Sequence, residues 1–228
     1  MTWAVLLASG KGERLGAELP KQFLELGGRL VIEHSLDLFQ ALPEIDAVVI
    51  VVHPQYLARL EELLGRCSRA KISAVLPGGA TRQQSAALGL QAINATSGRV
   101  LIHDSARPLV TAQIVRSCLA GLEQAPAVTA TIESSDTIIE IDNDGFLQAL
   151  PDRSRLRRVQ TPQAFDLELI RRAHALAAKE NYHAAGDDCG LVLRYGLGRV
   201  LVVPGEPANL KLTTREDFLL ASALLNRE

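Results

Sequence analysis

The chain has 228 residues, of which 47% are hydrophobic and 22% are charged, so it can bury a full core and is too apolar for a disordered protein. A formal net charge of −2 excludes a surface built for nucleic acid, and affinity for anions must come from local clusters of cations. No stretch approaches the roughly eighteen apolar residues of a membrane span and the N-terminal apolar run is too short for a signal peptide, so we expect a cytoplasmic protein.

Apolar runs of strand length alternate with amphipathic helical stretches, which is typical of crossover units on a mostly parallel sheet. The pattern predicts strands at 4–8, 47–52, 72–76, 99–102, 127–132 and 199–203, and helices at 30–40, 55–65, 81–93, 111–122, 166–178 and 214–225. The strand runs are rich in Val, Ile and Leu without strict alternation, which predicts helices on both faces. We therefore expect a doubly wound α/β fold, with residues 1–228 forming one domain. Cys67, Cys118 and Cys189 have no metal-ligand spacing and are expected to be buried, reduced thiols.

One segment interrupts this alternation. Two β-prone runs, 135–141 and 146–150, flank the turn Asp142-Asn143-Asp144-Gly145, which predicts a hairpin. We expect residues 133–160 to project from the sheet as a β-hairpin arm. The apolar residues of this arm need a cover, and a second subunit is the simplest one. The sequence therefore predicts a homodimer formed through the arm.

The first predicted strand leads into a glycine-rich loop with several cations. The sequence there is Ser9-Gly10-Lys11-Gly12-Glu13-Arg14-Leu15-Gly16, followed by Pro20-Lys21-Gln22. Glycines let backbone N–H groups approach phosphate oxygens, and the cations oppose the phosphate charge. Leu15 stands where a dinucleotide fingerprint needs its third glycine, which argues against an oxidoreductase on a Rossmann-like fold, and the P-loop spacing also fails. A nucleotide site of another kind is indicated, the alternative being a turn with solvated cations.

Three further clusters follow later strands or precede the last helix. Gly78-Gly79-Ala80-Thr81-Arg82-Gln83-Gln84-Ser85 would let the backbone approach a flat base, or is a plain turn in which Thr81 caps a helix. His103-Asp104-Ser105-Ala106-Arg107-Pro108 offers a carboxylate for a ribose or magnesium and a guanidinium for phosphate, or an ordinary loop salt bridge. Asn209-Leu210-Lys211-Leu212-Thr213-Thr214 places a lysine just before a helix that opens with Thr214-x-x-Asp217, a variant capping box.

Together these motifs cover nearly the whole chain in a fixed order. The series is G-x-G-x-R-x-G with P-K-Q, G-G-x-x-R-x-x-S, H-D-S-A-R-P, D-R followed by T-P-Q, and N-L-K-L-T-T. It resembles the 2-C-methyl-D-erythritol 4-phosphate cytidylyltransferase family of the non-mevalonate isoprenoid pathway, and is similar also to the ribitol 5-phosphate cytidylyltransferases. The resemblance implies a Rossmann-like nucleotidyltransferase fold. It also implies a reaction, with Mg²⁺ present, in which the substrate's phosphate attacks the α-phosphorus of CTP and pyrophosphate leaves.

The resemblance also implies roles for individual residues. Arg14, Lys21 and Lys211 would surround the triphosphate as the catalytic cations. The nucleotide would be bound by Ala8, Ser9, Gly10, Gly12, Gly79, Ala80, Ser85 and Asp104, and the small polyol phosphate by Asp104, Arg107, Thr137, Arg153 and Gly186. Asp104 would assist a magnesium ion held mainly by the nucleotide phosphates. Thr137 and Arg153 would act across the dimer interface.

The chain departs from the family pattern at Gly186, where a threonine is usual, so a hydroxyl is missing on the substrate side. Subfamily signals are mixed, because Ser105-Ala106-Arg107 matches the erythritol enzymes whereas Asp136-Thr137-Ile138-Ile139-Glu140 matches the ribitol enzymes. Methylerythritol phosphate is the expected substrate, and ribitol 5-phosphate or another polyol phosphate is the alternative. A non-catalytic nucleotide-binding module is the alternative of another class, and the presence of all three candidate cations argues against it.

Overall fold

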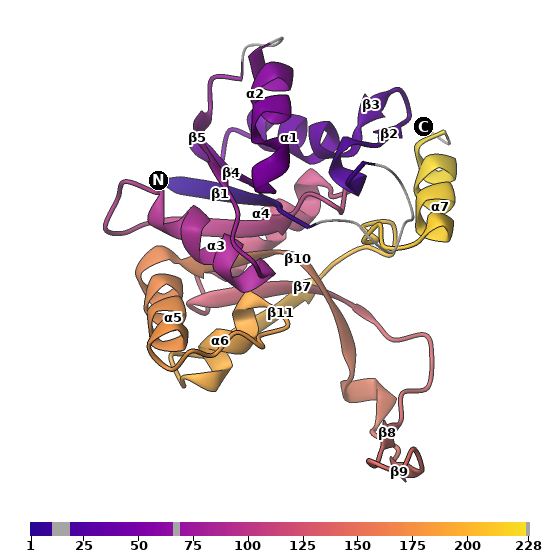
Figure 1. Ribbon diagram of the computed structural model, residues 1–228. Helices are drawn as coiled ribbons and strands as arrows, with labels where there is room; N and C mark the ends of the chain where they lie inside the picture. The colour runs from indigo at the N-terminus through magenta and orange to yellow at the C-terminus, as the bar shows by residue number, and fades with distance from the viewer. Residues whose placement is uncertain (11–18, 66–68, 227–228) are drawn as a thin grey trace.

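The computed structural model describes residues 1–10, 19–65 and 69–226. Its centre is a seven-stranded sheet (Figure 1). The strand order is β11 (Val200–Pro204), β7 (Ala127–Glu133), β10 (Arg157–Asp166), β6 (Arg99–Asp104), β1 (Thr2–Ala8), β4 (Ala47–Val52) and β5 (Ile72–Pro77). β10 runs antiparallel to its neighbours β6 and β7, and the other pairs are parallel. The mostly parallel sheet predicted from the sequence is confirmed.

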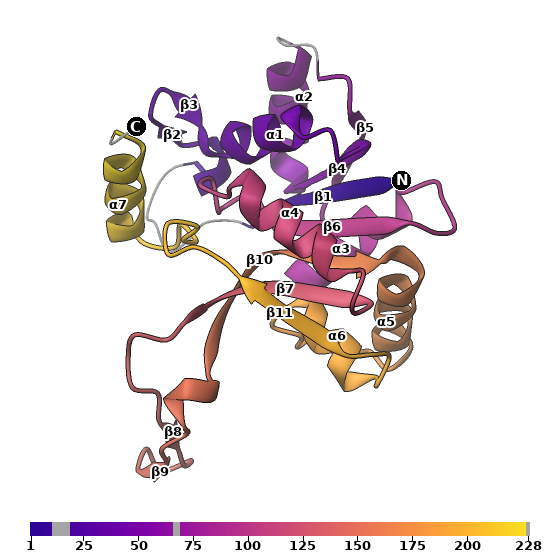
Figure 2. The ribbon, with the colours of Figure 1, turned by 180° about the vertical axis from the view of Figure 1, so that it is seen from behind.

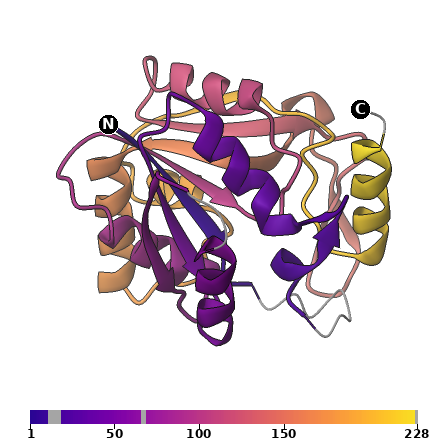
Figure 3. The same cartoon turned by 90° about the horizontal axis from the view of Figure 1, so that it is seen from above.

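Helices cover both faces of the sheet, as Figure 3 shows from above. One face carries α1 (Val31–Ala41), α2 (Leu57–Gly65) and α4 (Ala112–Gly121), and the other carries α3 (Arg82–Gln91), α5 (Leu167–Lys179) and α6 (Asp188–Arg194). Strand β1 divides its side chains between the two layers: Leu6 packs in the cluster of α1 and α4, whereas Val5 packs in that of α3 and α5. Because both faces are buried, β1 is apolar from Trp3 to Ala8.

Helix α3 lies unusually close to the sheet. A Cβ added at Gly89 would lie 2.5 Å from Cγ1 of Val5, so a residue with a side chain there would push the helix away. Thr81 is the N-cap of α3, and its hydroxyl accepts a hydrogen bond from the N–H of Gln84 at 3.1 Å. The close packing and the cap together bring the first turn of α3 to the carboxyl ends of the strands.

Two elements of the sheet region were not predicted. β10 begins with two arginines and contains Pro162, so it has no apolar run of strand length, and α6 has only seven residues. β10 is nevertheless inserted between β6 and β7, where its polar side chains Gln160, Thr161 and Gln163 are buried. Their hydrogen bonds to other segments satisfy these groups, which is why a polar strand can occupy the middle of a sheet.

Between β7 and β10 the chain leaves the sheet, and Figures 1 and 2 show this segment extending away from the body. β8 (Glu140–Ile141) pairs with β9 (Leu147–Ala149), and the short helix η4 (Arg153–Arg155) follows. The paired strands are shorter than the predicted runs 135–141 and 146–150. The large apolar side chains here are exposed: Ile138, Ile139, Ile141, Phe146, Leu147 and Leu150.

The C-terminal segment of the chain packs against residues near the N-terminus. Residues 205–214, here called the C-terminal strap, connect β11 to α7 (Arg215–Leu225). α7 packs beside the small antiparallel pair β2 (Glu25–Leu26) and β3 (Arg29–Leu30), through a cluster of Leu26, Val31, Leu212 and Ala221 (Figure 2). Thr214 and Asp217 form the predicted capping box of α7. Through Leu212 the strap is thereby held against β2 and the start of α1.

Two predictions made from composition can be compared with the structure. Cys118 and Cys189 are free and buried, and Cys67 lies outside the described residues. Among the described residues, no helix is long and apolar enough to cross a membrane.

Candidate active site

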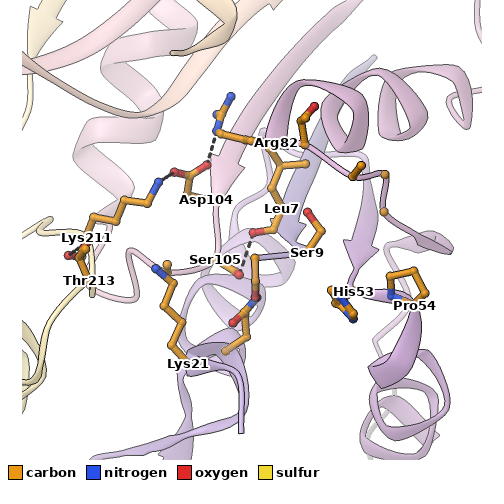
Figure 4. A pocket seen from close by; sticks show the side chains of 17 residues that line it. Leu7, Ser9, Lys21, His53, Pro54, Arg82, Asp104, Ser105, Lys211 and Thr213 are labelled. Carbon is orange, nitrogen blue, oxygen red and sulfur yellow. Dashed lines mark hydrogen bonds and ion pairs between the residues drawn. The ribbon is translucent and has the colours of Figure 1, made fainter. Parts of the chain in front are cut away.

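A cavity of about 710 Å³ opens at the carboxyl ends of β1, β4, β5 and β6 (Figure 4). This edge is where open α/β sheets bind their ligands. Of the residues predicted for the site, seven line the cavity: Ser9, Gly10, Lys21, Gly79, Ala80, Asp104 and Lys211. The cations Lys21 and Lys211 come from opposite ends of the chain. The structure therefore brings the N-terminal loop and the C-terminal strap to one place.

The loops after β1 and β5 touch each other on one side of the cavity. The hydroxyl of Ser9 donates to Oγ of Ser85 at 2.7 Å, and that oxygen also accepts the N–H of Gly79 at 3.2 Å. A Cβ at Gly78 would lie 2.5 Å from Cβ of Ser9, so only glycine permits this approach. Ser85 is fully buried and does not line the cavity. Its side chain holds the two loops together.

Lys21 is positioned by the short helix η2 (Lys21–Phe23). Its ammonium donates to the carbonyl of Leu212 in the C-terminal strap at 2.7 Å. The adjacent Gln22 is buried, and its amide donates to the carbonyls of Ala8 at 2.5 Å and Gly10 at 2.8 Å. Gln22 thus joins η2 to the end of β1. We did not assign it a role from the sequence, although it belongs to the P-K-Q motif.

Asp104, at the end of β6, lies between two cations in Figure 4. Its Oδ1 accepts from Nε of Arg82 at 2.9 Å, and its Oδ2 accepts from Nζ of Lys211 at 2.6 Å. Burial alone would raise the pKa of Asp104, but the charges of Arg82 and Lys211 and their hydrogen bonds hold it well below its usual range. The carboxylate is therefore ionised at neutral pH. Arg82 was not among the predicted site residues, although the spacing G-G-x-x-R contained it.

The backbone of Asp104 is fixed by β10. Its N–H donates to Oγ1 of Thr161 at 3.0 Å, which leaves the Thr161 hydroxyl free to donate to Nδ1 of His103 at 3.1 Å. Nε2 of His103 then carries the proton and donates to the carbonyl of Arg107 at 3.2 Å. Burial lowers the pKa of His103 to about 4, so the ring is neutral. Through these hydrogen bonds His103 shapes the turn after β6.

Arg107 does not line the cavity. Its Nη1 donates to the carbonyl of Asn209 at 2.8 Å and its Nη2 to the carbonyl of Val159 at 3.3 Å. The buried amide of Asn209 donates to the carbonyl of Thr161 at 2.9 Å. Arg107 and Asn209 therefore tie the C-terminal strap to β10, which fixes the backbone two residues before Lys211.

The remaining predicted residues lie elsewhere. Thr137, Arg153 and Gly186 are exposed and do not line the cavity of this chain, and Nη1 of Arg153 donates to the carbonyl of Ser135 at 3.2 Å. Ala8 is buried and does not line the cavity. Gly12 and Arg14 lie outside the described residues. A Cβ at Gly186 would meet no atom within 4 Å, so space alone does not explain this glycine.

The cavity combines the glycines Gly10, Gly78 and Gly79 with the charged side chains of Lys21, Arg82, Asp104 and Lys211. A flat base can approach the glycine loops closely, and the two lysines can neutralise a polyphosphate. Within the described parts of the chain, no group of three or more His, Cys, Asp or Glu residues is arranged to hold a metal ion. Asp104 is the acidic side chain among the described residues that line the cavity.

Comparisons with known proteins identify the family of this chain. The family model for 2-C-methyl-D-erythritol 4-phosphate cytidylyltransferase matches residues 2–227. The proteins of that name from Thermobifida fusca and Geobacillus kaustophilus are both 42% identical to this chain; each match covers 97% of it, and 92% and 96% of the relatives. The crystal structure of 4-diphosphocytidyl-2C-methyl-D-erythritol synthase from Anaerococcus prevotii superposes with a TM-score of 0.88 at 32% identity, covering 100% of this chain and 99% of that one. The chain therefore belongs to the 2-C-methyl-D-erythritol 4-phosphate cytidylyltransferase family.

Proposed function

We propose that the protein transfers CMP from CTP to 2-C-methyl-D-erythritol 4-phosphate, the step that gives this family its name. An oxygen of the substrate's phosphate attacks the α-phosphorus of CTP. The bond from the α-phosphorus to the bridging oxygen breaks, and pyrophosphate leaves with that oxygen. The product is a CDP-alcohol. Because the nucleophile is already an anion, the reaction needs no general base, and catalysis depends on charge neutralisation and in-line positioning.

One observation carries this proposal: Lys21 and Lys211 line the same cavity as the glycine loops after β1 and β5. In this proposal the glycine loops bind the cytosine base through Gly10, Gly79 and Ala80, and the two lysines stabilise the charge that builds up on the phosphates. Arg14, outside the described residues, would add a third cation. Such fixed cations act strongly because the protein pays no reorganisation cost during the reaction.

Magnesium is part of the proposal. Mg²⁺ is usually held by one or two carboxylates together with substrate phosphates. Asp104 fits this role, since its carboxylate is ionised, lines the cavity and has lone pairs beyond those shared with Arg82 and Lys211. When bound, the metal would neutralise part of the triphosphate charge. Asp104 would supply one oxygen and the nucleotide phosphates would supply the others.

We also propose a homodimer formed through the arm of residues 133–160. The exposed apolar side chains of the arm support it, because a large apolar patch on a monomer is costly in water. Thr137 and Arg153 lie on this arm and do not line the cavity of their own chain, so we propose that a substrate contact by either is made in the partner subunit. Arg107 and Gly186 would complete the polyol-phosphate side. A cytoplasmic location is supported by the free thiols Cys118 and Cys189.

A panel of pyrophosphate-release assays tests the function. CTP, ATP and GTP are each combined with methylerythritol 4-phosphate, ribitol 5-phosphate or no acceptor, with Mg²⁺ or with EDTA. We expect release with CTP, methylerythritol 4-phosphate and Mg²⁺, and little in the other combinations. Faster release with ribitol 5-phosphate would identify ribitol 5-phosphate as the preferred substrate. CTP binding without release for any acceptor would favour a non-catalytic nucleotide-binding module.

A further inference from the structure

Arg82 stands between two carboxylates, one inside the cavity and one outside it. Its Nε donates to Oδ1 of Asp104 at 2.9 Å, and its Nη1 donates to Oδ2 of Asp188 at 2.7 Å. Asp104 in turn accepts from Lys211 at 2.6 Å. The charges therefore alternate from Asp188 through Arg82 and Asp104 to Lys211. Asp188 is the member of this series farthest from Lys211, and it does not line the cavity.

Asp188 is itself held rigidly. It is 1% exposed at the start of α6, and its backbone N–H donates to Oε1 of Gln163 in β10 at 3.1 Å. Its Oδ1 accepts from Nε2 of His174 in α5 at 3.0 Å. Burial opposes ionisation of Asp188, but the charge of Arg82 and the contacts with His174 and Arg82 lower its pKa below the usual value. Asp188 thus presents a fixed negative charge to the outer side of Arg82.

Arg82 shares its N–H groups between Asp104 and Asp188. This sharing decides which oxygen of Asp104 remains available to Lys211. A guanidinium can bind a carboxylate with two parallel N–H bonds, and this bidentate arrangement is the stronger one. Side-on bidentate pairing would use Nε and Nη2, but Asp188 holds Nη1 and so fixes the guanidinium in an orientation in which only Nε bonds to Asp104. Nη2 is buried and has no hydrogen-bond partner among the described residues. Oδ2 of Asp104 therefore remains for Lys211.

We propose that Asp188 is a positioning residue for Lys211: by holding the outer edge of Arg82, it prevents bidentate pairing of Arg82 with Asp104 and keeps the Lys211 ammonium at Oδ2. Without the charge of Asp188, the guanidinium turns toward Asp104 and takes the place of Lys211. The ammonium then loses its fixed position over the cavity. The catalytic consequence rests on the proposed function, in which Lys211 stabilises the phosphates in the transition state.

The test is a double-mutant cycle with Asp188→Asn and Lys211→Met. Asn keeps the shape of Asp and removes its charge. We expect Asp188→Asn alone to lower kcat about 10-fold, and to lower it less than about 2-fold when Lys211 is already Met, because coupled residues are not additive. If Asp188→Asn caused only a general structural defect, it would lower kcat by the same factor whether residue 211 is Lys or Met. Equal effects of Asp188→Asn in both backgrounds would overturn the proposal.

Asp187→Asn is the matched control. The neighbouring carboxylate accepts from the N–H of Gly190 at 2.7 Å and from Nε2 of Gln163 at 2.9 Å, so it caps α6 and makes no hydrogen bond to Arg82. Thermal unfolding of both single variants measures the stability that each has lost. The effect of Asp187→Asn on kcat should be the same whether residue 211 is Lys or Met.

A second readout does not depend on turnover. Trace acetylation followed by peptide mass spectrometry measures the reactivity of each lysine, with Lys71, which donates to the carbonyl of Leu42, as the internal reference. We expect Lys211 to be labelled severalfold faster in Asp188→Asn and unchanged in Asp187→Asn. Unchanged labelling in Asp188→Asn would contradict the positioning role. Wild-type protein that releases no pyrophosphate would instead refute the proposed function and leave this comparison valid.

Discussion

Lys21 and Lys211 reach the cavity with different partners. Lys21 donates to the carbonyl of Leu212, 191 positions away in sequence, whereas Lys211 pairs with the carboxylate of Asp104. In the second contact the carboxylate neutralises the charge of Lys211 until a ligand competes. Single side chains therefore set both the amount of positive charge in the cavity and its location.

Replacing Lys21 tests its part in the reaction. Lys21→Met keeps the length of the side chain and removes its charge, so kcat/KM for CTP should fall by about 10²–10³, the cost of losing one donor that stabilises a transition state. Lys71→Met is the control, since Lys71 also donates to a backbone carbonyl but lies outside the cavity. Steady-state pyrophosphate release measures both. An equal loss in the two variants would show that the effect is structural.

His103 gives the stability of the fold a pH dependence. Burial is the main cause that lowers its pKa from 6.5 to about 4, with Asp104 and the carbonyl of Arg107 acting in the opposite direction. The unfolded chain therefore takes up a proton before the folded one does. The stabilisation is complete above about pH 6.5 and falls as the pH drops toward 4, by about 2 kcal/mol at pH 5.

Urea unfolding at pH 7.5 and pH 5 measures this effect. His103→Gln keeps one acceptor and one donor and cannot titrate, so its free energy of unfolding should change less between the two pH values than that of the wild type. Its stability at pH 7.5 should be lower, because the contact of the ring with Phe39 is lost. The same pH dependence in both proteins would assign the titration to other groups.

Strand β10 positions several parts of the site through hydrogen bonds. It runs antiparallel between β6 and β7, and it carries the buried polar side chains Gln160, Thr161 and Gln163. Thr161 fixes the backbone of Asp104, Gln160 bonds to the C-terminal strap, and Gln163 bonds to the start of α6. One strand therefore connects the turn after β6, the strap of Lys211 and the helix of Asp188.

Gln163 tests the contribution of this strand. Its Oε1 accepts from the N–H groups of Asp188 and Cys189, and its Nε2 donates to Asp187 and Thr129. Gln163→Met would leave these groups buried and unsatisfied, and should lower the free energy of unfolding by about 2–4 kcal/mol. Gln113→Met removes one exposed hydrogen bond to Ser117 and should cost less than about 0.5 kcal/mol. Similar unfolding curves for the two variants would contradict this assignment.

In the molecule as a whole, a sheet covered on both faces carries an arm whose large apolar side chains are exposed among the described residues. Leu6 and Val5 are fully buried on opposite faces of β1, whereas Phe146 in the arm is 71% exposed. Burying such a patch against a second copy would stabilise the assembly by about 25 cal/mol per Å² of apolar surface removed from water. The arm is thus the part of the molecule for which self-association has the clearest driving force.

Light scattering measures the assembly. The wild type should have twice the 24.6 kDa mass of one chain, and Phe146→Asp should shift the protein toward the monomer. Leu220→Asp is the control, because Leu220 is 53% exposed on α7, away from the arm. A wild-type monomer at working concentration would refute the dimer, as would a dimer unaffected by Phe146→Asp.

Much of the site could be predicted because it follows from local sequence. The glycines of G-G-x-x-R and the cap Thr81 act through residues a few positions away, and the apolar runs of β1 and β4 identify a sheet buried on both faces. Motif spacing also indicated the family, which the comparisons then established. The partners of Arg82 and Gln22 could not be predicted in this way, since no local pattern specifies which distant group a buried polar side chain will meet.

By itself, the sequence determined the alternation of strands and helices, the glycine loops and the membership of the family, because periodicity and turn chemistry depend on near neighbours. Only the tertiary structure decided that the polar strand β10 lies inside the sheet, that Asp104 is shared by Arg82 and Lys211, and that Asp188 stands behind Arg82. These contacts join residues 22 to 107 positions apart. Burial makes a paired charge stable and an unpaired one costly, so the folded core decides which partners remain together.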